Sequence, residues 1–263
     1  MDKEVFGSIE NNRDAVHKDN LVKLANIIKS SKYCVVLTGA GVSTESGIPD
    51  FRSPDTGLWT KVDPMAALSN TTFRTDPVGF YQFIEDMMDV FFKAEPNECH
   101  KAIAELEGLG YIKTVITQNI DGLHRRAGSQ NMLEVHGNTE GGKCIRCDKT
   151  FSMDHIMKLV KAGELPPTCE ECGSLIKPNI VLFEDQLPID FVLAQEEIKK
   201  SDLLIVIGSS LQVAPVCYLP TMSRRFSIIN LMPTPYDSYA ESVIQGKAGT
   251  TMKMIKELVT SSQ

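Results

Sequence analysis

The sequence predicts an α/β fold in which a doubly wound parallel sheet carries a smaller inserted domain. Short apolar runs recur along the chain, helical segments separate them, and two long stretches interrupt the alternation. Strands that alternate with helices are typical of a parallel sheet with helices on both faces. We therefore expect the interrupting stretches, residues 53–93 and 138–177, to form the smaller domain.

Composition and charge restrict the class of protein. A chain of 263 residues with 42% hydrophobic and 23% charged residues can form a large folded domain with a smaller one inserted in it. The net charge of -7 and the lack of clustered Lys and Arg argue against direct nucleic-acid binding. No run approaches the roughly 20 apolar residues of a membrane span and the start is unlike a signal peptide, so we expect a cytoplasmic protein without a membrane partner.

The first predicted helix and strand are neighbours in the sequence. Asp19 or Asn20 can cap a helix whose apolar residues, from Leu21 to Ile28, follow the spacing of one helical face. The nearly continuous apolar run 33–37 comes next, as expected for a parallel strand covered on both faces.

Three further apolar runs are predicted as strands, at residues 111–116, 203–207 and 226–229, with helices at 99–106 and 191–199. Each of these runs closes on small or polar residues. In open parallel sheets, ligands bind beyond the carboxyl ends of the strands. The polar residues that follow the runs are therefore expected to meet at one site.

Four cysteines form two Cys-x-x-Cys pairs separated by 21 residues: Cys144, Cys147, Cys169 and Cys172. Two such pairs are typical of a tetrahedral zinc site, and a pair of disulfides is the alternative, which a reducing compartment disfavours. Four thiolates leave no coordination position for water or substrate, so one zinc ion is expected to have a structural role. The other three cysteines are expected to be small buried apolar residues: Cys34, Cys99 and Cys217.

A glycine-rich turn at residues 39–44 follows the first strand. Its two glycines, Gly39 and Gly41, let the backbone approach a pyrophosphate, whose charge nearby N–H groups can stabilise. Thr44 stands where the usual dinucleotide motif has a third glycine, so a plain tight turn remains an alternative. The continuation favours ligand binding because it brings a carboxylate, an aromatic ring and a guanidinium together: Asp50, Phe51 and Arg52.

Polar residues at two other strand ends are candidates for chemistry. Residues 117–121 supply an amide pair and a carboxylate, which can hold ribose hydroxyls and a carboxamide, although a turn bonded to its own backbone fits as well. His136 follows the apolar run 132–135, and its unperturbed pKa of about 6.5 suits a general base if it faces the site. A lone histidine is more often structural, and that is expected for the remaining ones: His17, His100, His124 and His155.

These motifs resemble, in one order, those of the sirtuins, the NAD-dependent protein lysine deacylases. The likeness covers residues 20–250 and is greatest to bacterial members. It rests on residues 39–43 with 47–52, 117–121, 136–137, the two cysteine pairs, and 208–210. The resemblance implies a Rossmann-like large domain and a small domain made of a helical module and a zinc module. The expected boundaries are 1–52, 96–137 and 179–263 for the large domain, 53–95 for the helical module with the cofactor loop, and 138–178 for the zinc module.

The resemblance implies an activity and its partners. Sirtuins cleave the nicotinamide–ribose bond of NAD and transfer the acyl group of an acyl-lysine to ADP-ribose, which releases free lysine and 2'-O-acyl-ADP-ribose. NAD as co-substrate and acyl-lysine proteins or peptides are thus expected to bind. By the same resemblance, His136 is the base that activates a ribose hydroxyl, Asn119 positions ribose and water, and Asp121 with the Ile120 backbone holds the carboxamide.

The resemblance also implies further NAD contacts. Phe51 shields the reacting face, and Asp50 and Arg52 order the cofactor loop. Lys247 and Ala248 lie by the adenine. The remaining positions are Gly39, Ala40, Gly41, Ser43, Thr44, Gln118, Gly208, Ser209, Ser210, Asn230 and Leu231.

The acylated peptide is expected to add as a strand beside the segment that contains Ile180, Val181, Leu182 and Phe183. The chain departs from the family here, because Glu184 stands where members commonly have glycine. Either the backbone bends differently at this point, or a negative charge borders the peptide groove.

The helical module gives an expectation about the acyl group. Members that remove succinyl or malonyl groups carry Tyr-x-x-Arg, whereas this chain has Tyr81 and Ile84 at those positions. A carboxylated acyl chain would be buried without a cation, so neutral groups such as acetyl are expected.

Three rival functions remain open on the sequence. A zinc-containing NAD dehydrogenase needs an open metal position, which four cysteines deny. A catalytically silent NAD-dependent reader of acylated proteins is disfavoured by the presence of both His136 and Asn119. Mono-ADP-ribosyl transfer to protein shares the step that cleaves nicotinamide from NAD.

Overall fold

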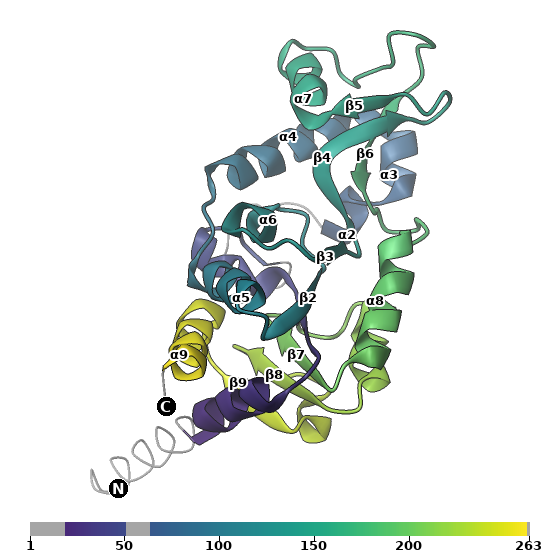
Figure 1. The fold of residues 1–263 in the computed structure, drawn as a ribbon. Coiled ribbons are helices and arrows are strands. Elements are labelled where there is room, and N and C mark those ends of the chain that lie inside the picture. Colours follow the sequence, from purple (N-terminus) through teal and green to yellow (C-terminus); the bar gives the residue numbers. More distant parts are fainter. Residues whose placement is uncertain (1–18, 51–63, 262–263) are drawn as a thin grey trace, which may run out of the picture.

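The computed structural model describes residues 19–50 and 64–261, which fold around two separate sheets (Figure 1). The larger sheet has six strands, all parallel, in the order β3-β2-β1-β7-β8-β9. Its strands are β1 Cys34–Thr38, β2 Ile112–Thr117, β3 Met132–Glu134, β7 Leu203–Ile207, β8 Phe226–Asn230 and β9 Ser242–Gln245. The four apolar runs predicted as strands match β1, β2, β7 and β8 to within one residue at each end, whereas β9 was not predicted.

Helices cover both faces of this sheet. Residues 19–30, which are helical, pack on one face together with α5 (Glu98–Gly108) and α9 (Ala248–Thr260). On the other face lie α8 (Ile189–Lys200) and the 3-10 segment η4 (Val216–Met222). The fold class predicted from the alternation of strands and helices is confirmed.

Alternate residues of the central strands enter the two hydrophobic cores. Cys34 and Val36 of β1 belong to the core under α5 and α9, while Val35 and Leu37 belong to the core under α8. A strand buried on both faces has no polar side, which is why these segments read as continuous apolar runs rather than alternating ones.

The order of the strands reverses between β1 and β7, because the chain runs outward through β2 and β3 on one side and through β8 and β9 on the other. In doubly wound sheets this switch point, at the carboxyl ends of the strands, is where ligands bind. The glycine-rich turn after β1 and the Gly208 turn after β7 therefore lie at the expected place.

The smaller sheet and the remaining helices form a third hydrophobic core, at the top of Figure 1. The sheet is antiparallel, in the order β5-β4-β6. The strands of this sheet are β4 Gly137–Cys144, β5 Thr150–Ser152 and β6 Ile176–Ile180, and the helices of this part of the structure are α2 Pro64–Ala67, α3 Asn70–Thr75, α4 Pro77–Lys93 and α7 Met153–Lys161. A core of its own supports a separate small domain, whose boundaries stay a prediction.

Side-chain caps set where several helices begin. Asp76 accepts from the backbone N–H of Gly79 at 3.0 Å, and Pro77 occupies the first turn of α4, where its missing N–H costs nothing. Asn97 and His100 form a reciprocal capping box at the start of α5. None of the helices within residues 19–50 and 64–261 is both long and apolar enough to cross a membrane.

Candidate functional site

The glycine-rich turn packs directly on the turn that follows β7. Gly208 has φ +61°, and a Cβ added to Gly41 would lie 2.8 Å from the Cα and carbonyl oxygen of Gly208. A side chain at residue 41 would push the two turns apart, so the glycine is required by this close approach. The first part of the turn forms two short 3-10 segments, η1 (Ala40–Val42) and η2 (Thr44–Ser46).

Ser43 lies at the centre of a buried polar cluster that joins this turn to the end of β2. Its hydroxyl donates to Asp121 Oδ2 at 2.6 Å and accepts from Asn119 Nδ2 at 3.1 Å. The structure thus brings together three predicted site residues from segments more than 70 positions apart in the sequence.

The Asp121 carboxylate is almost fully buried, with 8% of the residue exposed. Burial raises the pKa of this carboxyl, and the bonds from Ser43, the Leu123 N–H and Asn119 partly oppose the rise. Oδ1 accepts from the Leu123 N–H at 2.9 Å, at the start of α6 (Leu123–Ala127). The carboxylate is therefore held in one orientation at the carboxyl edge of the sheet.

Gln118 bonds across the sheet rather than within its own turn. Its Nε2 donates to Ser209 Oγ at 3.0 Å and to the Thr38 carbonyl oxygen at 3.2 Å. Asn119 Nδ2 similarly reaches the Gly39 carbonyl oxygen at 3.3 Å. The alternative that residues 117–121 form a turn with their side chains bonded only to its own backbone is therefore wrong.

His136 follows β3 and lies beside the end of β2. Its Nδ1 is 2.9 Å from the Gln118 carbonyl oxygen, which can only accept, so Nδ1 carries the proton and Nε2 has the free lone pair. Burial lowers the pKa of this imidazole below its usual value, and the bond to the Gln118 carbonyl opposes the shift in part. A neutral ring with Nε2 free to accept a proton is the form that a general base needs at pH 7.

Two histidines expected to be structural lie against the same cluster. His100 is fully buried, with Nε2 3.4 Å from Ser43 Oγ, while its Nδ1 accepts from the Asn97 N–H at 3.3 Å. His124 Nε2 contacts Thr38 Oγ1 at 3.0 Å, and its ring packs edge-on against His100 with centroids 4.7 Å apart. The capping pattern at Asn97 signals a role for His100 in its helix, but no sequence pattern signals its contact with Ser43.

Burial keeps both of these histidines neutral, lowering the pKa of His100 to about 4 and that of His124 well below its usual value. Below about pH 6.5 the unfolded chain binds protons that the folded chain does not, so folding stability is expected to fall as the pH drops. His100 alone can contribute about 3 kcal/mol by pH 4.

Denaturant unfolding at intervals between pH 7 and 5 measures this loss, in a range where most carboxylates stay ionised. The variant His100→Gln should unfold with a shallower pH dependence than the wild type. Equal slopes for the two proteins would contradict this assignment.

The outer predicted NAD contacts lie at the ends of β8 and β9. Asn230 closes β8 and donates to the Met232 carbonyl oxygen at 2.7 Å, and Leu231 is 63% exposed. Ala248 begins α9, whose next N–H, that of Gly249, donates to Glu45 Oε2 at 2.6 Å. Glu45 thereby joins the start of α9, which Lys247 precedes, to the glycine-rich turn.

Of the remaining predicted NAD contacts, the structure describes some and leaves others outside its range. Ser209 is buried beside Gln118, and Ser210, half-buried, follows it at the same edge. Thr44 is exposed, with its hydroxyl bonded back to the Gly41 carbonyl oxygen at 3.0 Å. Asp50 ends the first described segment, whereas Phe51 and Arg52 lie outside the described residues.

The predicted peptide-binding segment alternates between burial and exposure. Ile180 and Leu182 are buried in the core of the small domain, at 3% and 2% exposed, whereas Val181 and Phe183 are half-buried. Of the four residues, only Val181 and Phe183 have side chains that a substrate strand could contact. The Val181 N–H donates to the His136 carbonyl oxygen at 2.9 Å, so this segment joins the residues around His136.

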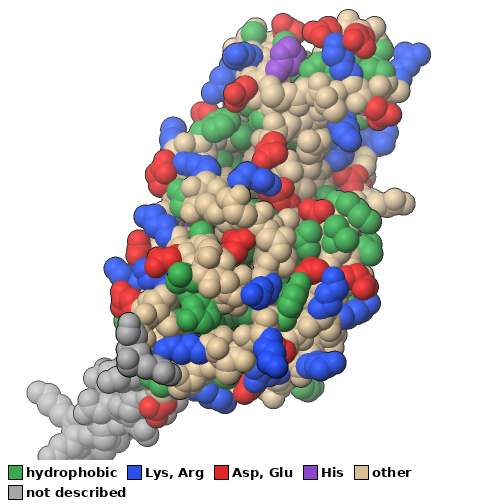
Figure 2. Space-filling model, in the orientation of Figure 1, with side chains coloured by type: hydrophobic (Ala, Val, Ile, Leu, Met, Phe, Trp, Pro, Cys, Tyr) green, Lys and Arg blue, Asp and Glu red, His purple; other side chains and the backbone are tan. Residues whose placement is uncertain are grey.

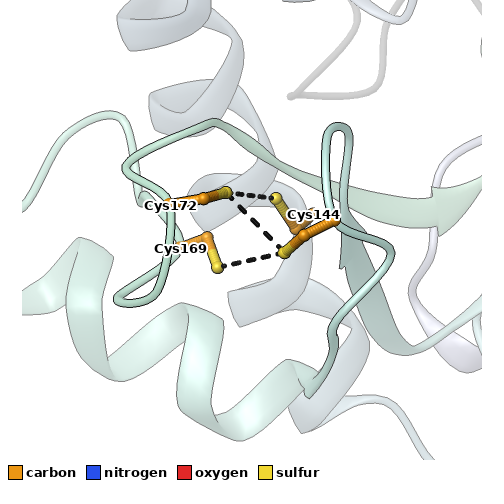
Figure 3. Close-up of side chains that lie close together, drawn as sticks. Cys144, Cys169 and Cys172 are labelled. Atoms are coloured by element: carbon orange, nitrogen blue, oxygen red, sulfur yellow. Dashed lines mark hydrogen bonds between the residues drawn. The ribbon is translucent and has the colours of Figure 1, made fainter.

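The four cysteines of the two Cys-x-x-Cys pairs lie together, as predicted. Their sulfur atoms are all within 4.8 Å of one another, and the shortest separations are 3.3 Å for Cys144–Cys172 and 3.7 Å for Cys147–Cys169 and Cys147–Cys172. Figure 3 shows Cys144, Cys169 and Cys172 pointing toward one another. A tetrahedral zinc ion with bonds of about 2.3 Å places its sulfur ligands about 3.8 Å apart, so the cluster fits zinc.

The two cysteine loops share one backbone geometry. In each, the residue four positions after the first cysteine donates its N–H to that cysteine's carbonyl oxygen, at 3.1 Å for Asp148 and 2.8 Å for Gly173. Both residues have positive φ, 59° and 71°. Lys149 also joins the loops through ion pairs of 2.7 and 2.8 Å to Glu170 and Glu171. Matched loops of this kind bring four thiolates to one point.

Charged residues of both signs are interspersed on the face drawn in Figure 2, with no continuous basic patch on that face. Hydrophobic side chains gather there over the upper part of α8. The exposed apolar residues of that helix are Ile189, Val192 and Leu193.

Comparison with known sequences finds one family across most of the chain. The profile of the Sir2 family matches residues 39–215. An NAD-dependent protein deacetylase 2 from Caldanaerobacter subterraneus subsp. tengcongensis is 49% identical over 244 residues, which cover 93% of this chain and 98% of that one. An NAD-dependent protein deacylase 2 from Archaeoglobus fulgidus is 44% identical over 248 residues, 92% of this chain and 97% of that one.

Solved structures agree with this match. One described as "Structural Basis for the Mechanism and Regulation of Sir2 Enzymes" has a TM-score of 0.85 and 43% identity, covering 92% of this chain and 98% of that one. Another, described as "Sir2-p53 peptide-NAD+", has a TM-score of 0.82 and 37% identity, covering 89% of this chain and 96% of that one.

Proposed function

Because the chain belongs to the Sir2 family, we propose that it is an NAD-dependent protein lysine deacylase that transfers the acyl group to ADP-ribose. The observation that carries the proposal is that His136, Asn119 and Asp121 follow the adjacent strands β2 and β3 at the carboxyl edge of the parallel sheet. A base, an amide and a buried carboxylate at one sheet edge are the groups that this reaction needs.

The residues present fit the dinucleotide. Its phosphates would lie beside the turn of Gly39 and Gly41, which the close packing of Gly41 on Gly208 holds at the carboxyl ends of β1 and β7. Bound NAD supplies an electrophilic ribose carbon and a nicotinamide leaving group. Asp121 would accept from the carboxamide N–H, and Asn119, already held by Ser43, would orient the ribose and water.

In this proposal His136 acts as the base through Nε2. The Gln118 carbonyl oxygen fixes the ring and its tautomer, so Nε2 can take a proton from a ribose hydroxyl once the acyl oxygen has attacked the ribose carbon. The lowered pKa keeps the ring in the neutral form at pH 7. Positioning of a weak amide nucleophile against the ribose carbon supplies the rest of the rate.

The zinc ion would be structural. Four thiolates fill its tetrahedral coordination, so it would offer no position to substrate or water. Cys144 and Cys169 are buried in the core of the small domain, and the metal would hold the two cysteine loops against that core. The small domain would comprise residues 53–95 and 138–178, inserted into the large domain.

Neutral acyl groups are the proposed substrates. Ile84 is fully buried in the apolar core of the helical module, and the Tyr81 hydroxyl donates to the Ile176 carbonyl oxygen. Neither position can offer a cation to a carboxylate. Proteins and peptides with acetyl-lysine are therefore the expected partners, ahead of succinyl or malonyl forms.

Incubation with NAD and an acetyl-lysine peptide, followed by mass spectrometry, tests the proposal. The expected products are nicotinamide, the deacetylated peptide and O-acetyl-ADP-ribose, with at least tenfold slower turnover of the succinylated peptide. Nicotinamide release without acyl transfer would favour ADP-ribosyl transfer instead. NADH would indicate a dehydrogenase, and peptide binding without any turnover would indicate a silent reader.

A further inference from the structure

Residues 182–185 form a tight turn at the end of the predicted peptide-binding segment. The Asp185 N–H donates to the Leu182 carbonyl oxygen at 3.0 Å, which closes a four-residue turn. The third residue, Glu184, has φ +78°. A type II turn requires positive φ at this position and normally uses glycine there. Glu184 thus adopts the left-handed conformation that usually requires glycine.

The Glu184 side chain makes contacts that a glycine cannot make. Its Oε2 accepts from the Thr71 N–H at 3.0 Å and from the Thr71 hydroxyl at 2.7 Å. Thr71 belongs to the first turn of α3 in the helical module, 113 positions away. A residue with a side chain in this left-handed conformation is strained, and these two bonds offset the strain.

The same turn is already paired with the helical module through its backbone. The Phe183 N–H donates to the Leu68 carbonyl oxygen at 2.8 Å, and its own carbonyl oxygen accepts from the Asn70 N–H at 3.0 Å. Along an extended strand, neighbouring residues direct their backbone groups to opposite edges. One edge is thus occupied by residues 68–70, while on the other edge the Leu182 N–H and carbonyl oxygen bond to Asp185 within the turn, and both sets of bonds hold the turn in place.

The next residue, Asp185, has its charge balanced within the fold. Its Oδ2 lies 2.8 Å from Lys177 Nζ and accepts from the Leu182 N–H at 3.0 Å, and its Oδ1 accepts from Asn70 Nδ2 at 2.5 Å. Asp185 and Glu184 thus fix the turn to α3 through side-chain contacts with Asn70 and Thr71. A groove of about 470 Å³ lies beside these residues, lined in part by Asn70, Ile180, Val181 and Asp185.

We propose that Glu184 is a positioning residue for the acyl-lysine peptide: its contact with Thr71 holds the 182–185 turn in the conformation that the peptide strand binds. This inference rests on the proposed function. With the contact in place, the turn is ordered before the peptide arrives, and no ordering cost is added to binding. Without it, the peptide must order the turn, so peptide affinity falls while NAD affinity and the chemistry at His136 stay the same.

Four variants separate the contact from the backbone strain. Glu184→Gly removes both, Glu184→Ala removes the contact and keeps the strain, and Glu184→Gln keeps an oxygen that can accept from Thr71. Thr71→Val removes the hydroxyl from the other side of the same contact. Thr75→Val is the matched control, because the Thr75 hydroxyl bonds only within α3, to the Thr71 carbonyl oxygen at 2.8 Å.

The measurements are the KM for an acetyl-lysine peptide, the KM for NAD, kcat, and the Kd of a fluorescent acetyl-lysine peptide by anisotropy. Glu184→Gly and Glu184→Ala are expected to raise the peptide KM and Kd about three- to tenfold, with NAD KM and kcat within twofold of wild type. Glu184→Gln and Thr75→Val should match the wild type. The double variant Glu184→Ala with Thr71→Val should be no weaker than Glu184→Ala alone, because one contact is lost in both.

An unchanged peptide Kd in Glu184→Gly and Thr71→Val would overturn the proposal, and so would an equal change in the KM for NAD. Because anisotropy measures peptide binding without turnover, this test can fail or succeed independently of the test of deacylase activity. Thermal unfolding shows whether a loss of peptide affinity in Glu184→Gly comes from misfolding. Because glycine relieves the backbone strain at this position, the unfolding midpoint of Glu184→Gly should be at least as high as that of Glu184→Ala.

Discussion

Replacement of His136 with alanine is expected to lower the rate of acyl transfer by about 100- to 10000-fold. The physical reason is that a ribose hydroxyl is a weak acid at pH 7 and loses the proton acceptor that the proposal gives it, the Nε2 atom that the Gln118 bond leaves free. Cleavage of nicotinamide precedes this proton transfer in the proposed sequence. The variant is therefore expected to retain nicotinamide exchange while it loses production of deacetylated peptide.

Single-turnover mass spectrometry of both products measures the split between the two steps. His155→Ala is the matched control, because His155 stacks on Phe151 in the zinc module, with ring centroids 5.4 Å apart, and lies on none of the segments that meet at His136. Its acyl transfer should equal that of the wild type. Equal losses of nicotinamide exchange and acyl transfer in His136→Ala would show that the histidine acts earlier than proposed or only supports the fold.

Removal of zinc is expected to inactivate the protein slowly, through unfolding of the small domain. Zinc binding to such thiolate sites is worth about 10 to 16 kcal/mol, which is as large as the whole folding stability of a typical domain. Cys144 and Cys169 are buried in the same core as α4 and α7, so loss of the metal would disrupt the packing of the helical module as well. The 182–185 turn, which is proposed to bind the peptide, is fixed to α3 and would then lose its support.

The measurement is metal content, activity and far-UV circular dichroism during incubation with a chelator. We expect about one zinc ion per chain, and activity should fall in parallel with the dichroism signal. Cys169→Ser should reproduce the metal-free state, whereas Cys217→Ala, in the core of the large domain under α8, should keep both zinc and activity. Immediate inactivation that another divalent metal reverses at once would instead indicate a catalytic zinc.

Local patterns in the sequence predict much of the fold. The continuous apolar runs identify four of the six parallel strands because burial on both faces leaves no polar positions, and such a pattern is visible in any short window. The strand β9 was missed because its four residues, Ser242 to Gln245, are too few and too mixed to form such a run. Spacing alone identifies the zinc cluster, since each Cys-x-x-Cys pair forms one local loop.

The sequence by itself identified the residues that are proposed to carry the chemistry, through motifs whose members lie within a few positions of one another. Only the tertiary structure decided how they are paired. Ser43 contacts Asp121 across 78 positions because β1 and β2 are adjacent and in register, and His100 reaches Ser43 because α5 packs over the same edge. The side chain of Glu184 is likewise paired with a distant residue, Thr71, 113 positions away. Local propensity cannot encode such contacts, because they depend on packing between elements that the chain brings together only when it folds.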